Sequence, residues 1–318
     1  MIDYILILVG LFLLYKGADW FVEGASSLAK HFGISPLVIG LTVVAFGTSM
    51  PELIVNVFAS VQDNSDVAFG NIIGSNIFNT LLILGLTGAI TPLLVKRSTV
   101  WKEIPFALLA VLVLITMSNK TILANGSENV LTRADGIVLI FFFFIFLYYI
   151  FESIKNTKIE SSDDIGKYSR SKISLMLIVG LISLVIGGRF TVDGAVSIAR
   201  QMEISEFLIS STIVAAGTSL PELITSVAAA AKKEIDISVG NIIGSNIFNI
   251  FLIMGISSTI FPLTVPTGVN ADLVILTIAT FLFFVFMFTG EKHKLERWEA
   301  MILLVMYIGY IVFIINRG

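Results

Sequence analysis

Residues 70–79 read GNIIGSNIFN, and residues 240–249 repeat the same ten residues without a change. A second pair lies at the same offset of 170 residues, since VAFGTSMPELI at 44–54 recurs as VAAGTSLPELI at 214–224. Two long matches at one fixed offset are far beyond coincidence between apolar segments and indicate a duplicated unit. The chain therefore consists of two related halves.

The composition places this duplicated chain in a membrane. Of its 318 residues 56% are apolar and 14% are charged, whereas a soluble protein carries roughly 25% charged residues. That deficit excludes a soluble enzyme, a nucleic-acid binder and a disordered chain. The absence of cysteine excludes disulfide scaffolds, thiolate metal sites and cysteine nucleophiles. We expect an all-α polytopic protein surrounded by membrane lipid, with no cofactor and no evident obligate protein partner.

Ten stretches are apolar over the ~20 residues that a transmembrane helix needs. They are expected near residues 3–27, 36–60, 67–90, 100–118, 134–152, 173–199, 207–230, 237–261, 270–289 and 298–316. Residues 1–15 contain no Lys or Arg, which argues against a cleaved signal peptide and for a first span. Together the spans occupy most of the chain and leave no sizeable soluble domain.

Each half contains five of these spans, and this odd number has a consequence for topology. The second half must enter the membrane from the opposite side, so the halves are expected to be inverted-topology repeats about a pseudo-two-fold axis. The expected organisation is a first repeat at 1–152, a linker at 153–172 and a second repeat at 173–318. Such repeats are typical of secondary transporters, which bind their substrate near the membrane midplane.

The basic residues predict the orientation. Fourteen of the 20 Lys and Arg residues lie in or beside the loops that connect odd-numbered spans to even-numbered ones, and four lie on the other side with the termini. Because cytoplasmic loops are enriched in Lys and Arg, we expect the 153–172 linker in the cytoplasm and both termini outside the cell membrane.

Two glutamates are expected near the middle of spans, Glu52 in the second and Glu222 in the seventh. A carboxylate at that depth costs several kcal/mol unless it is paired or protonated, so each is a candidate functional residue. A protonated glutamate that bonds a neighbouring helix is the structural alternative, but it would have to occur twice at equivalent positions. We therefore favour a cation site.

Further oxygen atoms accompany each glutamate in the sequence. Thr48 and Ser49 precede Glu52 by four and three residues, which predicts that all three share one helical face. The proline before Glu52 disrupts the helix and should free the carbonyl of Gly47, and open backbone at this depth is tolerated where it lines a cavity. Residues 215–222 repeat the pattern. A packing kink is the alternative for a single copy, and the duplicated glutamate argues against it.

The third and eighth spans each carry a polar stripe with a spacing of four residues. The stripes are Asn71, Ser75 and Asn79, and Asn241, Ser245 and Asn249. We expect ligands at the four positions nearest the span centres: Ser75, Asn79, Ser245 and Asn249. Helix–helix contact or support of the ligands is favoured over direct ligation for four other asparagines, Asn71, Asn76, Asn241 and Asn246.

All of these candidate ligands are oxygen atoms, which indicates a hard cation. Ca²⁺ takes about six to eight oxygen ligands, whereas soft metals prefer Cys, Met or His. The only histidines, His31 and His293, are expected in loops. Two carboxylates neutralise one Ca²⁺, and Na⁺ can use subsets of the same oxygens. If the two ions compete for shared ligands, one must leave before the other enters, and this is a physical basis for exchange.

The GTSMPE, GTSLPE and GNIIGSNIFN segments resemble the α-repeats of the cation/Ca²⁺ exchanger superfamily, specifically the prokaryotic Na⁺/Ca²⁺ exchangers. The resemblance covers nearly the whole chain. It implies Na⁺/Ca²⁺ antiport by alternating access, with Ca²⁺ extrusion as the expected direction and spans 1 and 6 sliding across the other helices. It implies a Ca²⁺ site formed by the carboxylates of Glu52 and Glu222 and the carbonyls of Thr48 and Thr218. It implies flanking Na⁺ sites with the carbonyls of Ala45 and Ala215 and the hydroxyls of Ser49, Ser219, Ser75 and Ser245, and it places Asn79 and Asn249 in the middle.

Three other functions remain as alternatives. A Ca²⁺/H⁺ exchanger would use the same glutamates as proton carriers, although such relatives usually have GN where this chain has GTS. A cation channel is disfavoured by paired halves around one midplane site. A membrane enzyme would need a base beside its nucleophile, and no His, Lys or Cys accompanies the glutamates. Asn at both positions 79 and 249, where family members often carry one Asp, puts K⁺ dependence and proton binding there in doubt.

Charged residues also occur in spans 1 and 6. Lys16, Asp19 and Glu23 follow one side of span 1, and Arg189 and Asp193 are separated by four residues in span 6. They suit either gating contacts at the mouths of a cavity or local pairing and snorkelling near the helix ends, and we favour the second interpretation.

Overall fold

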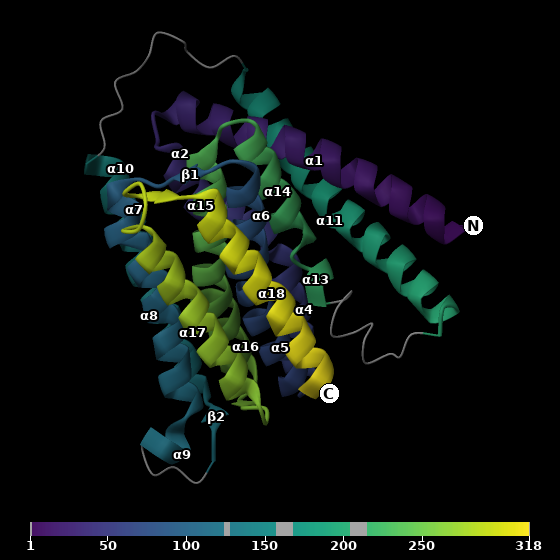
Figure 1. Cartoon of the computed structure of the whole chain (residues 1–318), viewed down its shortest axis with the longest axis vertical. Helices are drawn as coiled ribbons and strands as arrows, with labels where there is room; N and C mark the ends of the chain where they lie inside the picture. The colour runs from purple at the N-terminus through teal and green to yellow at the C-terminus, as the bar shows by residue number, and fades with distance from the viewer. Residues whose placement is uncertain (1, 124–127, 157–167, 204–214, 318) are drawn as a thin grey trace.

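A computed structural model describes residues 2–123, 128–156, 168–203 and 215–317, and most of these residues are helical (Figure 1). Eight of the described helices or continuous helical runs are long and apolar enough to cross a membrane. Five are single helices: α1 (Ile2–Phe32), α10 (Arg133–Asn156), α11 (Arg170–Gln201), α17 (Val269–Phe286) and α18 (Arg297–Arg317). The described part of the chain is therefore mostly helical, with apolar helices of the length that the predicted membrane class requires.

The other three runs contain more than one helical segment. They are α5 (Ser65–Ile77), η2 (Phe78–Ile83) and α6 (Leu84–Ile90); α7 (Arg97–Trp101) and α8 (Glu103–Ser118); and α15 (Ile235–Ile247), η4 (Phe248–Met254) and α16 (Gly255–Ile260). The segments η2 and η4 are π-helical, which is rare and often marks a functional site. A short helix, α9 (Lys120–Leu123), follows α8.

A ninth candidate span is bent. It consists of α2 (Pro36–Ile39), the π-helical η1 (Gly40–Val44), α3 (Ala45–Thr48) and α4 (Met50–Val61), with an angle of 47° between the part that ends at Thr48 and the part that begins at Met50. Of the stretch predicted at 207–230, only α13 (Ala215–Gly217) and α14 (Leu220–Ala231) lie within the described residues. Most of the predicted linker, residues 157–167, also lies outside them.

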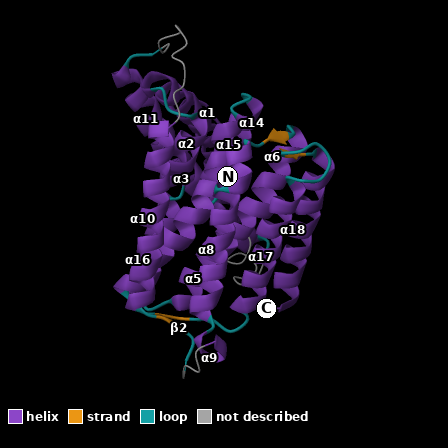
Figure 2. Ribbon diagram, turned by 90° about the vertical axis from the view of Figure 1, so that its left-hand side faces the viewer, coloured by secondary structure: helices purple, strands orange, loops and turns teal. Residues whose placement is uncertain are grey.

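Burial separates the central helices from the peripheral ones. The most apolar part of Ser65–Ile90 is 72% buried and that of Ile235–Ile260 is 89% buried, whereas the other six candidate spans range from 22 to 44%. In Figure 2, α18 stands at the right-hand edge of the bundle beside α6. The asparagine- and serine-rich helices are thus the ones that the protein encloses, which puts their polar side chains away from lipid.

The helices α1 and α11 form a separate antiparallel pair along one side of the molecule (Figure 1). Their contact is built on glycine. A methyl group on Gly17 would lie 2.9 Å from the backbone oxygen of Gly180, and one on Gly10 would lie 2.8 Å from that of Gly187. Because only glycine permits this approach, the two backbones touch directly.

Two short antiparallel strand pairs connect loops that lie far apart in the sequence. β1 (Leu93–Leu94) pairs with β4 (Lys294–Leu295), and β2 (Val130–Leu131) pairs with β3 (Leu263–Thr264). Each pair joins one strand from the first half of the sequence to one from the second half, so the two halves are interlocked.

Candidate functional site

A helix break delivers each glutamate to the centre of the protein. The break between α3 and α4 falls at Ser49, whose φ and ψ are −82° and 6°, and α4 begins with the Met50-Pro51 pair. The break before α14 falls at Ser219, with φ and ψ of −90° and 8°. The prolines end the preceding helical segment as the sequence predicted, and they place Glu52 and Glu222 in the first turn of the next helix.

Hydrogen bonds cross between the two breaks. Ser49 Oγ donates to Glu222 Oε1 at 3.0 Å, and Ser219 Oγ donates to Glu52 Oε1 at 2.9 Å. The two carboxylates are 0% and 1% exposed, and each accepts a hydrogen bond from the serine that precedes the other glutamate. The sequence predicted that Ser49 shares a face with Glu52, but the break at Ser49 turns its hydroxyl to the glutamate of the other half.

The third and eighth spans close the site as predicted walls. Ser75 Oγ lies 3.4 Å from Glu52 Oε1 and 2.9 Å from Ser219 Oγ, so the three groups form one hydrogen-bonded cluster. The threonine hydroxyls also cross between halves, since Thr48 Oγ1 donates to Asn241 Oδ1 at 3.1 Å and Thr218 Oγ1 donates to Asn71 Oδ1 at 3.3 Å. Each of these threonine bonds is the counterpart of the other at an offset of 170 residues with the partners exchanged.

Asn71 and Asn241 support the glutamate helices. Asn71 Nδ2 donates to the backbone oxygen of Glu52 at 3.2 Å, and Asn241 Nδ2 lies 3.5 Å from that of Glu222. Their side chains serve as partners to neighbouring helices, in line with the interpretation that the sequence favoured. The sequence did not reveal Asn56, which accepts from Asn71 Nδ2 at 2.6 Å; its position one helical turn after Glu52 was the available signal.

Five buried oxygens without a hydrogen-bond partner belong to predicted ligands. In the described part of the chain, nine buried side-chain nitrogen or oxygen atoms lack a hydrogen-bond partner, and five of them belong to predicted ligands. The five are Glu52 Oε2, Glu222 Oε2, Asn79 Oδ1, Asn249 Oδ1 and Ser245 Oγ. Unpaired buried oxygens are costly, so a set of them concentrated on predicted ligands fits an oxygen-coordinated cation.

The two candidate ligand asparagines lie in π-helical segments. Asn79 is the second residue of η2 and Asn249 is the second residue of η4. A π-turn widens the helix and changes the direction of its side chains, and such turns occur frequently at functional sites. The repeated GNIIGSNIFN gave no signal for this local geometry.

One predicted alanine ligand, Ala45, is less open than expected. The backbone oxygen of Ala45 accepts the Ser49 N–H at 3.0 Å, so only its second lone pair is available for an ion. Ala215 is the first described residue of α13, and its surroundings begin in residues that the structure does not describe. Within the described residues, no group of three or more His, Asp or Glu side chains gathers in one place, so the glutamate pair with its neutral oxygens is the candidate.

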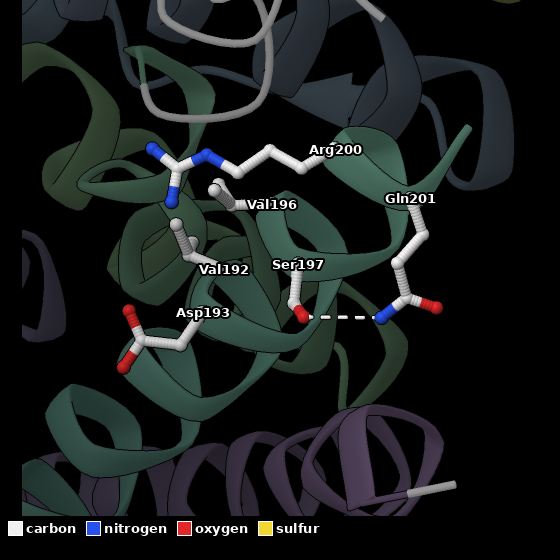
Figure 3. A pocket seen from close by; sticks show the side chains of 6 residues that line it. All are labelled: Val192, Asp193, Val196, Ser197, Arg200 and Gln201. Carbon is white, nitrogen blue, oxygen red and sulfur yellow. Dashed lines mark hydrogen bonds between the residues drawn. The ribbon is translucent and has the colours of Figure 1, made fainter. Parts of the chain in front are cut away.

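A cavity of about 730 Å³ lies apart from the glutamate pair on the C-terminal half of α11. Figure 3 shows its lining, in which Asp193 and Arg200 bring charge and Ser197 and Gln201 bring polar groups. One lining residue reaches toward the site, because Val192 contacts Gly217, the last residue of α13. Val192 therefore lies both in the cavity wall and next to the residue before Thr218.

The charged residues of α1 make contacts at one end of the pair. Lys232 Nζ, in the turn after α14, lies 2.6 Å from Asp19 Oδ1, and Ser26 Oγ donates to Glu234 Oε1 at 2.6 Å. In α11, Arg189 pairs at 3.6 Å with Asp193 on its own helix, and both side chains are largely exposed. Polar side chains of α1 thus contact the turn after α14, whereas the Arg189–Asp193 ion pair stays within α11.

Comparisons with known proteins agree with one another. The family described as "Sodium/calcium exchanger protein" matches residues 2–152 and 172–316. The chain is 38% identical to the putative antiporter CaxA of Alkalimonas amylolytica and 32% identical to the sodium/calcium exchanger MaX1 of Methanosarcina acetivorans, with 98% of each chain covered in both cases. Among solved structures, the sodium-calcium exchanger NCX_Mj superposes with a TM-score of 0.82 at 34% identity over 98% of both chains.

Proposed function

The chain belongs to the sodium/calcium exchanger protein family, and on this premise we propose that it is a secondary antiporter that exchanges Na⁺ for Ca²⁺ across the cell membrane. The observation that carries the proposal is the set of five unpaired oxygens on Glu52, Glu222, Asn79, Asn249 and Ser245. The relatives are exchangers and antiporters, not enzymes, and the chain is an integral membrane protein of the same kind.

The chemistry of the site suits a single Ca²⁺ ion at its centre. Two carboxylates balance the double charge of one divalent cation, and both are fully buried at the helix breaks. The second oxygen of each glutamate and the two asparagine oxygens supply neutral and charged ligands together, which is how Ca²⁺ sites are built. The proposed carbonyl ligands are those of Thr48 and Thr218.

Na⁺ is proposed to use the flanking hydroxyls. Ser49 and Ser219 contact one carboxylate each, so an ion beside either serine shares a ligand with Ca²⁺. Ser75, Ser245 and the carbonyls of Ala45 and Ala215 complete these sites in the proposal. Because the ions share carboxylates, occupancy by Na⁺ weakens Ca²⁺ binding, and one cargo leaves when the other binds.

We further propose that the ten predicted spans form two inverted repeats, 1–152 and 173–318, joined by a cytoplasmic linker. Three observations support this organisation. The family match divides into 2–152 and 172–316, the Ser–Glu bonds are exchanged between halves, and β1 lies 170 residues before β3. With the basic loops in the cytoplasm, both termini lie outside, and Ca²⁺ extrusion is the proposed direction.

Movement of the α1–α11 pair is the proposed means of alternating access. The pair is joined to itself by backbone contacts at Gly10, Gly17, Gly180 and Gly187, and it meets the core beside the helix breaks, where Phe21 approaches Gly47. Sliding of such a pair across the core would open the glutamate site to one side of the membrane and close it to the other.

Transport assays in proteoliposomes test the proposal. We expect ⁴⁵Ca²⁺ uptake to be driven by an outward Na⁺ gradient when the pH gradient and the membrane potential are collapsed by ionophores. Uptake that instead follows an imposed pH gradient and ignores Na⁺ would assign the chain to Ca²⁺/H⁺ exchange. Single-channel current in planar bilayers would contradict antiport altogether.

A further inference from the structure

We infer that Asn76 and Asn246, which are not predicted ligands, decide which end of each ligand amide faces the ion site. Asn76 orients the amide of Asn249, and Asn246 orients the amide of Asn79. Only the second of these arrangements also needs a hydroxyl, that of Thr80. The inference rests on the proposed function because it concerns how the ligands of that site are oriented. It assigns Asn76, Asn246 and Thr80 as positioning residues.

Orientation matters because the two ends of an asparagine amide have opposite effects on a cation. The carbonyl oxygen attracts a cation and the NH₂ group repels it, although the two ends are nearly equal in size. Asn79 and Asn249 are 1% and 0% exposed, and the Oδ1 atom of each has no hydrogen-bond partner. Both oxygens are available to an ion only while other groups hold the NH₂ ends away from it.

A backbone carbonyl fixes the orientation of the Asn249 amide. The backbone oxygen of Asn246 can only accept, and Asn76 Nδ2 donates to it at 3.2 Å. Asn76 Oδ1 therefore points the other way, where it accepts from Asn249 Nδ2 at 2.9 Å. Rotation of the Asn249 amide would bring two carbonyl oxygens to that distance, so its Oδ1 atom stays on the side of the site.

The orientation of the Asn79 amide depends instead on a hydroxyl. Asn79 Nδ2 donates to Asn246 Oδ1 at 3.1 Å, and Asn246 Nδ2 donates to Thr80 Oγ1 at 2.8 Å. A hydroxyl can either donate or accept. If Thr80 donated, both amides could rotate together, keep their two hydrogen bonds and turn the NH₂ group of Asn79 toward the ion. The ligand oxygen of Asn79 therefore depends on Thr80 acting as the acceptor.

The repeat itself shows that the two arrangements differ. Ile250 occupies the position 170 residues after Thr80, so the second copy has no hydroxyl at this place. Thr80 and Ile250 are 2% and 1% exposed, and both side chains are enclosed by protein. One ligand amide is thus held by the main chain, and the other is held by a side chain that a single substitution can remove.

Thr80→Val tests the inference, because it replaces the hydroxyl with a methyl group of similar size. The buried NH₂ group of Asn246 then loses its acceptor, which favours the rotated pair and turns the Asn79 NH₂ group to the ion. We expect the KM for Ca²⁺ in proteoliposomes to rise about tenfold, an effect of the size that one lost ligand produces, with Vmax and membrane insertion largely unchanged. Thr80→Ser keeps the hydroxyl and should retain the KM.

Thr87→Val is the matched control. Thr87 is also buried, but its hydroxyl donates to the backbone oxygen of Ile83 in its own helical run. Removal of this hydroxyl should leave the KM for Ca²⁺ unchanged, so it measures the general cost of deleting a buried hydroxyl near the site.

A double-mutant cycle separates positioning from general damage. Asn79→Asp presents an oxygen in either orientation, so adding Thr80→Val to Asn79→Asp should leave the KM at the value of Asn79→Asp alone. Equal KM values for Thr80→Val and the wild type, or the same rise in both backgrounds, would overturn the inference. Ca²⁺ uptake by the wild type that ignores Na⁺ would instead contradict the proposed coupling, and the cycle could still be measured by ⁴⁵Ca²⁺ binding to the purified protein.

Discussion

The core helices α4, α5, α14 and α15 around the glutamates are held together in one way, and the α1–α11 pair is held together in another. In the core, polar side chains reach from one helix to another, as in the bonds from Ser49 to Glu222 and from Ser219 to Glu52. In the pair, the backbones themselves touch at glycines, with Gly17 against Gly180. The core is fixed by directional bonds between particular atoms, and the pair is fixed by the close fit of two smooth surfaces.

The contact between these two regions explains what the difference allows. Near the helix breaks it is apolar, with Phe21 beside Gly47 and Val192 beside Gly217. The structure describes two polar contacts between α1 and the turn after α14: Asp19 with Lys232 and Ser26 with Glu234. Both lie toward one end of the pair. A pair that meets the core in this manner can shift as a unit without breaking the buried hydrogen bonds of the ion site.

The largest effect is expected when the charge of the core is removed. Glu52→Gln and Glu222→Gln should each abolish Na⁺-dependent ⁴⁵Ca²⁺ uptake, because the site keeps its shape but loses one of two charges that balance Ca²⁺. Glu103→Gln is the control, since Glu103 is also a buried carboxylate, bonded to Tyr149 away from the site, and should retain uptake. Full uptake by either site variant would refute the assignment of the ligands.

A smaller effect is expected when the pair is forced apart. Gly17→Ala places a methyl group 2.9 Å from the backbone oxygen of Gly180, so the two backbones must separate. We expect a loss of about 1–3 kcal/mol, measured as a lower midpoint of thermal unfolding in detergent, together with slower transport. The uptake KM for Ca²⁺ should change little, because the ion site belongs to the core.

Gly309→Ala is the matched control, and its expected effect on stability has the opposite sign. Gly309 lies in α18, and a methyl group there meets no described atom within 4 Å. Alanine is a better helix former than glycine by about 1 kcal/mol, so this variant should be neutral or slightly more stable. Equal stability of Gly17→Ala and Gly309→Ala would show that the glycine contact does not hold the pair together.

The sequence predicted the core far better than it predicted the pair. A ten-residue identity and two glutamates in apolar spans were enough to foresee the burial of Glu52 and Glu222, and the family match confirms the resemblance to prokaryotic Na⁺/Ca²⁺ exchangers. The glycine contact was missed although Gly10 and Gly17 recur at the same offset as Gly180 and Gly187, because glycine is common in transmembrane helices and signals no partner by itself.

Side-chain direction was the other limit of the sequence. Helical spacing assigned Ser49 to the glutamate of its own helix, and only the break at Ser49 sends its hydroxyl to Glu222. The π-turns at Asn79 and Asn249 depend on packing between helices and not on a local residue pattern. Sequence thus predicted the glutamates and serines that form the cross-half contacts, and tertiary packing decides which of their atoms face one another.

The smallest effect is expected at the contact between the two regions, where Lys232→Gln removes the ion pair with Asp19. Both side chains are about one-third exposed, so the pair is worth about 0.2–1 kcal/mol and its loss should shift a conformational equilibrium no more than about fivefold. Stability should hardly change, because neither group is left buried without a partner. The effect should appear in the position of α1 and α11 relative to the core.

A single introduced cysteine can report that position, because the chain has none of its own. Ser197 lines the cavity at the end of α11 where Gln201 bonds Asp3, which is the end of the pair opposite to the Asp19–Lys232 contact. If that contact holds the pair in place, Lys232→Gln should change the rate at which a water-soluble maleimide labels Ser197→Cys by about twofold to fivefold. Lys294→Gln, which breaks a pair with Glu291 within one loop, should leave the rate unchanged. Identical labelling in all three proteins would mean that the Asp19–Lys232 contact does not restrain the pair, and would leave the Ser26–Glu234 bond and the apolar contacts at Gly47 and Gly217 as the restraints.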